Sequence, residues 1–202
     1  MTVVGLLGAG RMGETLARLL AGAGHDVRLA NSRGPATLAG LVADIGPGAA
    51  ALAARDIADG AEVVILATRW EQLPDAVGAV PSWDGVIVVD TTNPRFGPGP
   101  DEVYDTGALT SSEVVAGLVP GARLVKAASH LSAELLGQDP ILSGGRRVIF
   151  VSGDNAPAKQ AIIDLFNAAG FYPIDLGDLV SGGRMQQFGG PLAGRNLLQG
   201  AT

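Results

Sequence analysis

The chain has 202 residues, of which 47% are hydrophobic and 17% are charged, and its formal net charge is −6. This length suffices for one α/β domain with a substantial core and is short for two full domains. The acidic balance and the lack of a basic run argue against nucleic-acid binding. Because no cysteine is present, disulfides, thiolate nucleophiles and cysteine-ligated metals are excluded, and redox chemistry must use a bound cofactor.

The first apolar run, Val3 to Leu7, is followed directly by Gly8-Ala9-Gly10-Arg11-Met12-Gly13 and then by a helix-like stretch, Glu14 to Leu20. This is the dinucleotide-binding pattern GxGxxG in its proper setting, between a strand and a helix. The first glycine permits a tight turn, the second lets the backbone approach a pyrophosphate, and the third lets the helix pack closely on the strand. The pattern predicts a diphosphate site at a helix N-terminus, formed by Gly8, Gly10, Arg11, Met12 and Gly13.

The segment after the second predicted strand, Asp26 to Ala30, indicates which dinucleotide binds. NAD-binding versions of the motif carry an Asp or Glu there for the ribose 2′-hydroxyl, whereas this chain has Asn31-Ser32-Arg33. Arg33 can donate two hydrogen bonds to a 2′-phosphate, and Asn31 and Ser32 can add neutral ones, so the segment favours NADP(H). In the alternative, Ser32 caps the next helix and Arg33 is solvated, since Gly34-Pro35 also resembles a helix start.

Short β-branched runs recur at Val63 to Leu66, Val86 to Val89 and Val148 to Val151, and being continuous they suit strands buried on both faces. Helical stripes separate them at Leu38 to Ile45 and Ala158 to Phe166, the latter with Asp154 as its predicted cap and Gly170 as its stop. This alternation predicts an α/β fold with a Rossmann-type, doubly wound, mostly parallel sheet.

We expect a single NAD(P)-binding domain over residues 1–202, with a core of about 1–140 and a small C-terminal αβ extension over about 141–202. The longest irregular stretch, Thr91 to Thr110, follows a strand at the ligand-binding edge of the sheet, where we predict a cover or partner contact. A surface excursion without a role is the alternative.

Four segments are expected to converge on the nicotinamide: Thr68-Arg69-Trp70, Thr91 to Pro94, Ala128-Ser129-His130 and a glycine-rich tail from Ser181 to Leu192. We assign Thr68, Arg69 and Asn93 to the cofactor. The predicted acceptor pocket is lined by Trp70, Pro94, Ser129, His130, Gly189 and Gly190. Trp70 has helix packing as its alternative role.

Acid–base groups are scarce, because His25 and His130 are the only histidines. His130 is the better placed, as a pocket wall or as a proton donor, and we assign no metal site. Lys126, on a predicted strand, serves packing or substrate charge. Reduction of a ketone or imine usually needs a positioned proton donor, whereas hydride exchange with a second redox cofactor needs two ring faces in contact. The sequence therefore favours hydride exchange with a second redox cofactor.

Several motifs in order carry a family resemblance that covers nearly the whole chain: the glycine turn, Asn31-Ser32-Arg33, Thr68-Arg69-Trp70-Glu71, Thr92-Asn93-Pro94, Val125-Lys126-Ala127, Val151-Ser152-Gly153-Asp154 and Gly190-Pro191-Leu192-Ala193-Gly194. The sequence resembles the F420-dependent NADP oxidoreductases, whose fold is similar to the cytosolic domain of the STEAP metalloreductases. The resemblance implies that Gly8, Gly10 and Gly13 cradle the pyrophosphate, that Ser32 and Arg33 hold the 2′-phosphate, that hydride passes directly from nicotinamide C4 to the deazaflavin, and that the protein is a homodimer.

Two departures from the family pattern fall in the expected acceptor pocket. Members often carry Pro where this chain has Arg69, and an aromatic-Asn-Thr sequence where it has Ala128-Ser129-His130. The family resemblance therefore supports NADPH binding more strongly than it supports the identity of the hydride acceptor. We expect that acceptor to be coenzyme F420 or a flavin.

Two other functions remain open. One is an NADPH-dependent reductase of a small imine or carbonyl compound with His130 as donor; the other is a non-catalytic NADPH-binding protein. The apolar start lacks a basic leader, and no apolar stretch is long enough to span a bilayer, so we expect a cytoplasmic protein with a small-molecule redox acceptor and no membrane partner.

Overall fold

The continuous apolar runs form central strands, because a parallel sheet covered on both faces leaves few positions facing water. β1 (Val3–Leu7), β4 (Val63–Leu66) and β5 (Ile87–Asp90) are buried along nearly their whole length. The computed structural model describes residues 1–97 and 102–200. The other strands are β2 (Asp26–Ala30), β3 (Ala49–Ala51), β6 (Arg123–Ala127), β7 (Ile141–Leu142), β8 (Gly145–Gly153), β9 (Tyr172–Asp175) and β10 (Leu198–Gln199).

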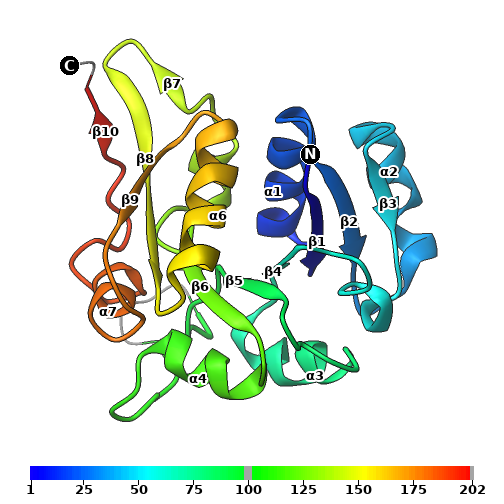
Figure 1. Cartoon of the computed structure of the whole chain (residues 1–202), viewed down its shortest axis with the longest axis horizontal. Coiled ribbons are helices and arrows are strands. Elements are labelled where there is room, and N and C mark those ends of the chain that lie inside the picture. The colour runs from blue at the N-terminus through cyan, green and yellow to red at the C-terminus, as the bar shows by residue number, and fades with distance from the viewer. Residues whose placement is uncertain (98–101, 201–202) are drawn as a thin grey trace.

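One sheet runs through the described residues. Its parallel part has the order β3-β2-β1-β4-β5-β6, and β8 then pairs with β6 in the antiparallel sense. β9 pairs with β8 in the parallel sense. β7 and β10 pair with the N-terminal half of β8 in the antiparallel sense. Figure 1 shows the β7 to β10 part at the left and the β1 to β3 part at the right. The predicted Rossmann-type, mostly parallel sheet is confirmed.

Helices cover the sheet on both faces and bury two separate apolar clusters. One face carries α1, α5 and α6, whose core residues include Leu16, Leu136 and Ile162. The other carries α3 and α4, with Leu73 and Val115 in the second cluster. The helices and 3₁₀ turns are α1 (Arg11–Gly22), η1 (Pro35–Leu38), α2 (Ala39–Ile45), η2 (Ala54–Asp56), η3 (Trp70–Gln72), α3 (Leu73–Gly78), α4 (Ser111–Leu118), α5 (Ala133–Leu136), α6 (Ala156–Ala168) and α7 (Ser181–Gln186).

The predicted cap of α6 is wrong by one residue. Asn155 is the N-cap, and its side chain accepts a hydrogen bond from the Ala158 N–H. Asp154 instead accepts from the Leu179 N–H in the C-terminal segment, 25 residues away. The predicted stop is correct, since Gly170 follows the helix with a φ of +91°.

The part of the chain beyond residue 140 continues the same sheet and core. β8 pairs with β6, and α6 packs Ile162 and Phe166 into the cluster that also contains Leu16 of α1.

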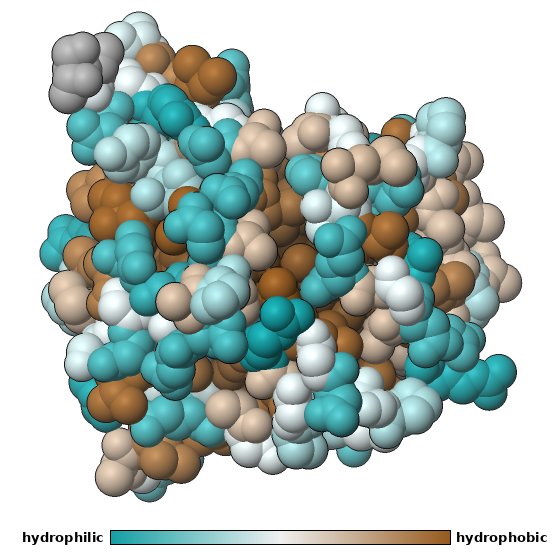
Figure 2. Space-filling model, viewed as in Figure 1, coloured by the Kyte–Doolittle hydropathy of each residue, from teal (hydrophilic) through white to brown (hydrophobic). Residues whose placement is uncertain are grey.

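Figure 2 shows the middle of one face hollowed, with apolar residues in the hollow. Within residues 1–97 and 102–200, no helix has the length and apolar character that a membrane crossing requires.

The glycine turn between β1 and α1 brings backbone segments into close contact. Gly8 has a φ of +109°, and a Cβ there would lie 2.5 Å from the Ala67 carbonyl oxygen. A Cβ on Gly13 would lie 1.9 Å from the Gly8 carbonyl oxygen. Both positions therefore exclude side chains for the reasons that the motif predicts.

We predict that Gly13→Ala lowers the free energy of unfolding by about 3 kcal/mol, the upper end of ordinary overpacking, because α1 must move off the turn. Gly22→Ala, at the end of the same helix, is the control, because a Cβ there would meet no atom within 4 Å. That variant should match or exceed the wild-type stability, as expected for Gly→Ala in a helix. Urea denaturation of the three proteins makes the comparison, and equal stabilities for Gly13→Ala and wild type would contradict the packing argument.

Candidate functional site

A cleft opens beside the glycine turn at the carboxyl ends of β1, β2 and β4, the edge where open α/β sheets bind ligands. Its volume is about 510 Å³. It contains two cationic residues, Arg33 and Arg69, and one acidic residue, Asp75 of α3. The lining residues are Leu7, Gly8, Ala9, Gly10, Asn31, Ser32, Arg33, Ala54, Ala67, Thr68, Arg69, Gln72, Asp75, Ala76 and Ala79.

The turn leaves space and hydrogen-bond donors for an anion. A Cβ at Gly10 would meet no atom within 4 Å, unlike one at Gly8 or Gly13. Gly10 lines the cleft, is the N-cap of α1 and provides no side-chain cap, so the N–H groups of the first helical turn have no side-chain capping partner. The buried Thr68 hydroxyl also lacks a partner within the described residues. These features fit the diphosphate and ribose of a dinucleotide.

The loop after β2 holds two unused polar side chains at the cleft. Asn31 organises the loop, because its Oδ1 accepts from the Arg33 N–H at 3.0 Å and its Nδ2 donates to Thr37 Oγ1 at 3.0 Å. Ser32 and Arg33 are exposed, and over residues 1–97 and 102–200 neither side chain makes a hydrogen bond or ion pair. Ser32 does not cap the following turn, whose N-cap is Gly34. Arg33 is therefore available to an anionic ligand.

The segment after β4 divides between the cleft and the core. Arg69 lines the cleft with a largely exposed side chain, 3.8 Å from Glu71. Trp70 is absent from the cleft lining and packs against the second apolar cluster. Trp70 thus packs against the core, which is the alternative role that we considered for it.

A second hollow lies on the other side of the glycine turn, between α1 and α5. Its volume is about 600 Å³, and it shares the start of α1 with the first cleft, since Gly10 lines one and Arg11 the other. We call it the α1–α5 groove. Its lining residues are Arg11, Met12, Glu14, Thr15, Arg18, Ser132, Ala133 and Glu134.

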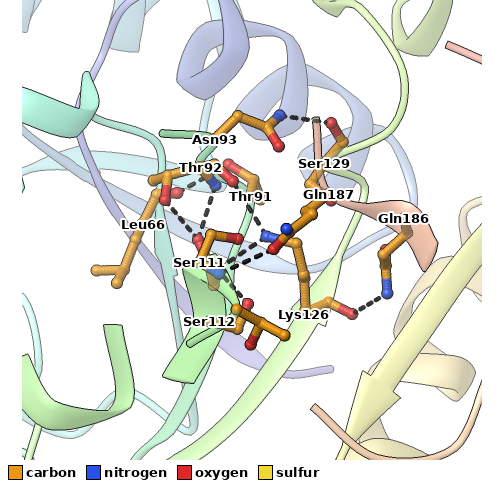
Figure 3. Close-up of polar contacts among 12 residues, drawn as sticks. Leu66, Thr91, Thr92, Asn93, Ser111, Ser112, Lys126, Ser129, Gln186 and Gln187 are labelled. Carbon is orange, nitrogen blue, oxygen red and sulfur yellow. Dashed lines mark hydrogen bonds and ion pairs between the residues drawn. The ribbon is translucent and has the colours of Figure 1, made fainter. Parts of the chain in front are cut away.

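Asn93 joins three of the predicted segments directly. Its Nδ2 donates to the Ser129 carbonyl oxygen at 2.8 Å, and its Oδ1 accepts from the Phe188 N–H at 2.8 Å. Figure 3 shows the Asn93 amide directed at Ser129. The loops after β5 and β6 and the C-terminal segment therefore meet at Asn93, and the amide that we assigned to the cofactor is hydrogen-bonded to the backbone of two other segments.

The remaining predicted wall residues occupy different positions. Pro94 is buried and its carbonyl accepts from the Tyr104 N–H, while Arg95 stacks over the Phe188 ring at 4.0 Å. The loop from Thr91 to Thr110 thus contacts the C-terminal segment; its residues 98–101 lie outside the described residues. Gly190 packs tightly, since its Cβ would lie 2.3 Å from the Arg184 carbonyl oxygen, and Gly189 has a φ of +85°. Neither glycine lines the cleft or the groove.

The turn after β6 is strained and contains unpaired polar atoms. Ala128 is fully buried with a φ of +58°, the one non-glycine residue with positive φ in the described chain. The buried Ser129 hydroxyl has no partner there. His130 packs its ring 4.6 Å from that of Phe150, and burial lowers its pKa to about 4, partly offset by the Val148 backbone. The imidazole is therefore neutral near pH 7.

Beneath these turns, Lys126 of β6 and Asp90 of β5 form an ion pair of 3.0 Å, and neither side chain is exposed. Asp90 also accepts from the Thr92 N–H, the Thr92 hydroxyl and the Ser112 hydroxyl, at 2.8, 2.7 and 2.5 Å. Lys126 Nζ donates a second bond to the Thr92 carbonyl oxygen. Burial alone raises the pKa of Asp90, but the Lys126 ammonium and these donors hold it below its usual value. Lys126 is thus held in a buried ion pair between neighbouring strands.

The network extends to the C-terminal segment. Gln186 Nε2 donates to the Lys126 carbonyl oxygen and to the Ser152 hydroxyl, and Figure 3 shows the first of these bonds. The Gln187 side chain accepts from the Ser111 N–H. Sequence reasoning missed Ser112 and Gln186, because each acts through a partner distant in the chain. In the described residues, no group of three or more His, Asp or Glu side chains forms a metal site.

Comparisons with known proteins agree with this geometry. The family model described as "NADP oxidoreductase coenzyme F420-dependent" matches residues 3–94. The structure of hypothetical protein SMa0349 from Sinorhizobium meliloti is 40% identical, with a TM-score of 0.91 over 98% of this chain and 96% of that one. A provisionally assigned F420-dependent NADP reductase from Arthrobacter sp. FB24 is 31% identical, with a TM-score of 0.76 over 89% of this chain and 86% of that one.

Two further relatives carry less weight. Metalloreductase STEAP3 of Rattus norvegicus is 30% identical over 88% of this chain, which spans about a third (34%) of that protein. An imine reductase from Aspergillus terreus, solved with NADPH4, is 20% identical, with a TM-score of 0.63 over 90% of this chain and 57% of that one, and shows likeness of fold alone.

We predict that Lys126→Met lowers the free energy of unfolding by about 3–5 kcal/mol near neutral pH, because the Asp90 carboxylate stays buried without its cation. In the wild type the Asp90 pKa is depressed, so its stabilisation is complete above the ordinary Asp pKa and is lost as pH falls through the folded value. In the variant that pKa rises, and the deficit relative to wild type shrinks on acidification.

Denaturation at neutral and acidic pH tests this prediction. The double variant Lys126→Met with Asp90→Asn is the control and should recover most of the loss, since no charge remains buried. A deficit of the same size at both pH values would show that the loss comes from packing and not from charge.

Proposed function

Because the chain belongs to the family of coenzyme F420-dependent NADP oxidoreductases, we propose that it transfers hydride between NADPH and a deazaflavin or flavin-like acceptor. The observation that carries the NADP part is the open glycine turn at Gly10 beside the unpaired cation Arg33, within the described residues. The similarity to the Arthrobacter protein, which extends over most of both chains, supports the deazaflavin part. The domain as a whole, residues 1–202, would act as one NADP-binding unit.

The first cleft would hold NADPH from the glycine turn to the loop after β2. The N–H groups at Gly10, Arg11 and Met12 would bind the diphosphate, while Ser32 and Arg33 would bind the 2′-phosphate. The unpaired hydroxyl of Thr68 would take a ribose or carboxamide contact, and Gly8 and Gly13 shape the turn.

The proposed reaction requires little acid–base chemistry from the protein. NADPH supplies a hydride at nicotinamide C4; the acceptor ring gains that hydride and one solvent proton, and NADP⁺ is left. The protein orients the two rings and excludes water. His130 is neutral and buried, and this chemistry requires no proton from it.

The alternative, reduction of a small imine or carbonyl compound, requires a proton donor and assigns that role to His130. A bell-shaped pH dependence that is abolished in His130→Ala would favour it, and a profile flat above pH about 5 would remove it, given a His130 pKa of about 4. Tight NADPH binding without hydride exchange to any acceptor would favour a non-catalytic protein.

Assembly as a homodimer is also part of the proposal. Apolar side chains at the β7 and β10 edge are exposed, among them Ile141, Leu142 and Leu198, and such residues commonly lie in contacts between subunits. Sedimentation equilibrium of the purified protein tests the oligomeric state.

Replacement of Arg33 by Ala should weaken NADPH binding by about 1–3 kcal/mol, the scale of a charge-assisted contact, and barely affect NADH. Fluorescence titration of both dinucleotides measures the effect. Arg69→Ala removes another arginine from the same cleft and is the matched control, in which both dinucleotides should change alike. Equal losses of NADPH and NADH affinity in Arg33→Ala would exclude the 2′-phosphate assignment.

The acceptor is tested by mixing the protein with NADPH and oxidised F420, FMN or no acceptor, and following nicotinamide and acceptor absorbance. We expect rapid reduction of F420, which would show that Arg69 and His130 are tolerated departures from the family pattern. If NADPH binds and neither acceptor is reduced, the acceptor assignment is wrong and imines and carbonyls become the next substrates to test.

A further inference from the structure

We propose that the α1–α5 groove binds the hydride acceptor and that the Arg11 guanidinium recognises an anionic tail on it, such as the phosphodiester of a deazaflavin coenzyme. This inference rests on the proposed function, because it identifies where the acceptor lies and which part of it the protein recognises. It gives Arg11 a side-chain role separate from that of its backbone N–H.

The position of the groove supports this assignment. It begins at the start of α1, where Gly10 lines the first cleft and the next residue, Arg11, lines the groove. A dinucleotide whose diphosphate rests on this turn extends in both directions from it. Its nicotinamide end would therefore lie next to the groove, and a ring held there can meet it.

The charges in the groove single out Arg11. Arg18 is already engaged, because it pairs with Glu14 at 2.9 Å and with Asp44 at 3.7 Å. Arg11 is exposed and, in the part of the chain that the structure describes, makes no ion pair or hydrogen bond. An exposed cation at the wall of a groove of about 600 Å³ is available for an anion on the ligand.

Glu134 of α5 lines the same groove and opposes an anion there. It is exposed and has the opposite charge to Arg11. An acceptor with an anionic tail is therefore expected to gain affinity when Glu134 is neutralised and to lose it when Arg11 is neutralised. A neutral acceptor with the same ring should respond to neither change.

The experiment measures binding and therefore does not depend on turnover. Protein saturated with NADP⁺ is titrated with two fluorescent deazaflavins: oxidised F420, and its chromophore ending at the ribityl chain without the phosphate. FMN and riboflavin form a second pair that differs only in the phosphate. Arg11→Gln should weaken F420 by about 10-fold or more, the effect of losing a charge-assisted contact, and change the tail-less chromophore less than about 2-fold.

Two controls separate this effect from a general change in charge. Glu134→Gln should strengthen F420 binding and leave the tail-less chromophore unchanged. Arg55→Gln removes the same charge from an exposed site on η2 and should leave the ratio of the two affinities unchanged. FMN against riboflavin shows whether the site requires the deazaflavin ring or only the anion.

The outcomes distinguish the two proposals. Equal losses for tailed and tail-less ligands in Arg11→Gln, or wild-type protein that binds both with equal affinity, would overturn the role of Arg11. If F420 binds in an Arg11-dependent manner but is not reduced by NADPH, the assignment of the groove is supported and the proposed hydride transfer is excluded.

Discussion

The buried ion pair between Asp90 and Lys126 is the constraint on which the carboxyl ends of β5 and β6 depend. Two charges removed from water are tolerable only when their geometry is good and their remaining hydrogen-bond capacity is used. Here the carboxylate accepts four bonds, and the ammonium reaches from β6 to the backbone of the loop after β5. The positions of Thr92 and Ser112 follow from this requirement, and Asn93, the residue after Thr92, bonds to the Ser129 carbonyl oxygen.

The glycine turn imposes a different constraint, one of space. Gly8 and Gly13 lack side chains because carbonyl oxygens occupy the positions that a Cβ would take, whereas the space at Gly10 is open. The same six-residue motif thus contains two glycines that the fold requires and one, Gly10, whose open space the proposed dinucleotide would use. Because Gly13 of α1 packs directly against the Gly8 carbonyl, the turn is formed by the fold itself and does not require a ligand.

The sequence predicts local features well and long-range polar contacts poorly. The glycine turn, the central strands and the stop at Gly170 depend on neighbouring residues, so pattern and spacing suffice. Asp154 and Asn155 are both good caps, and only the distant Leu179 N–H decides that Asp154 is used elsewhere. Likewise, the Asn93 amide meets Ser129 and Phe188, 36 and 95 residues away, which no local pattern contains.

The start of α1 borders both hollows, because Gly10 lines the first cleft and the next residue, Arg11, lines the α1–α5 groove. A movement of this helix start on filling one hollow therefore alters the shape of the other. Thermodynamic linkage then requires reciprocity: the factor by which a dinucleotide changes the affinity of the groove equals the factor by which a ligand in the groove changes that of the dinucleotide. In the proposed two-ligand site, a shared wall would thus couple the dinucleotide and the acceptor without a second domain or a moving lid.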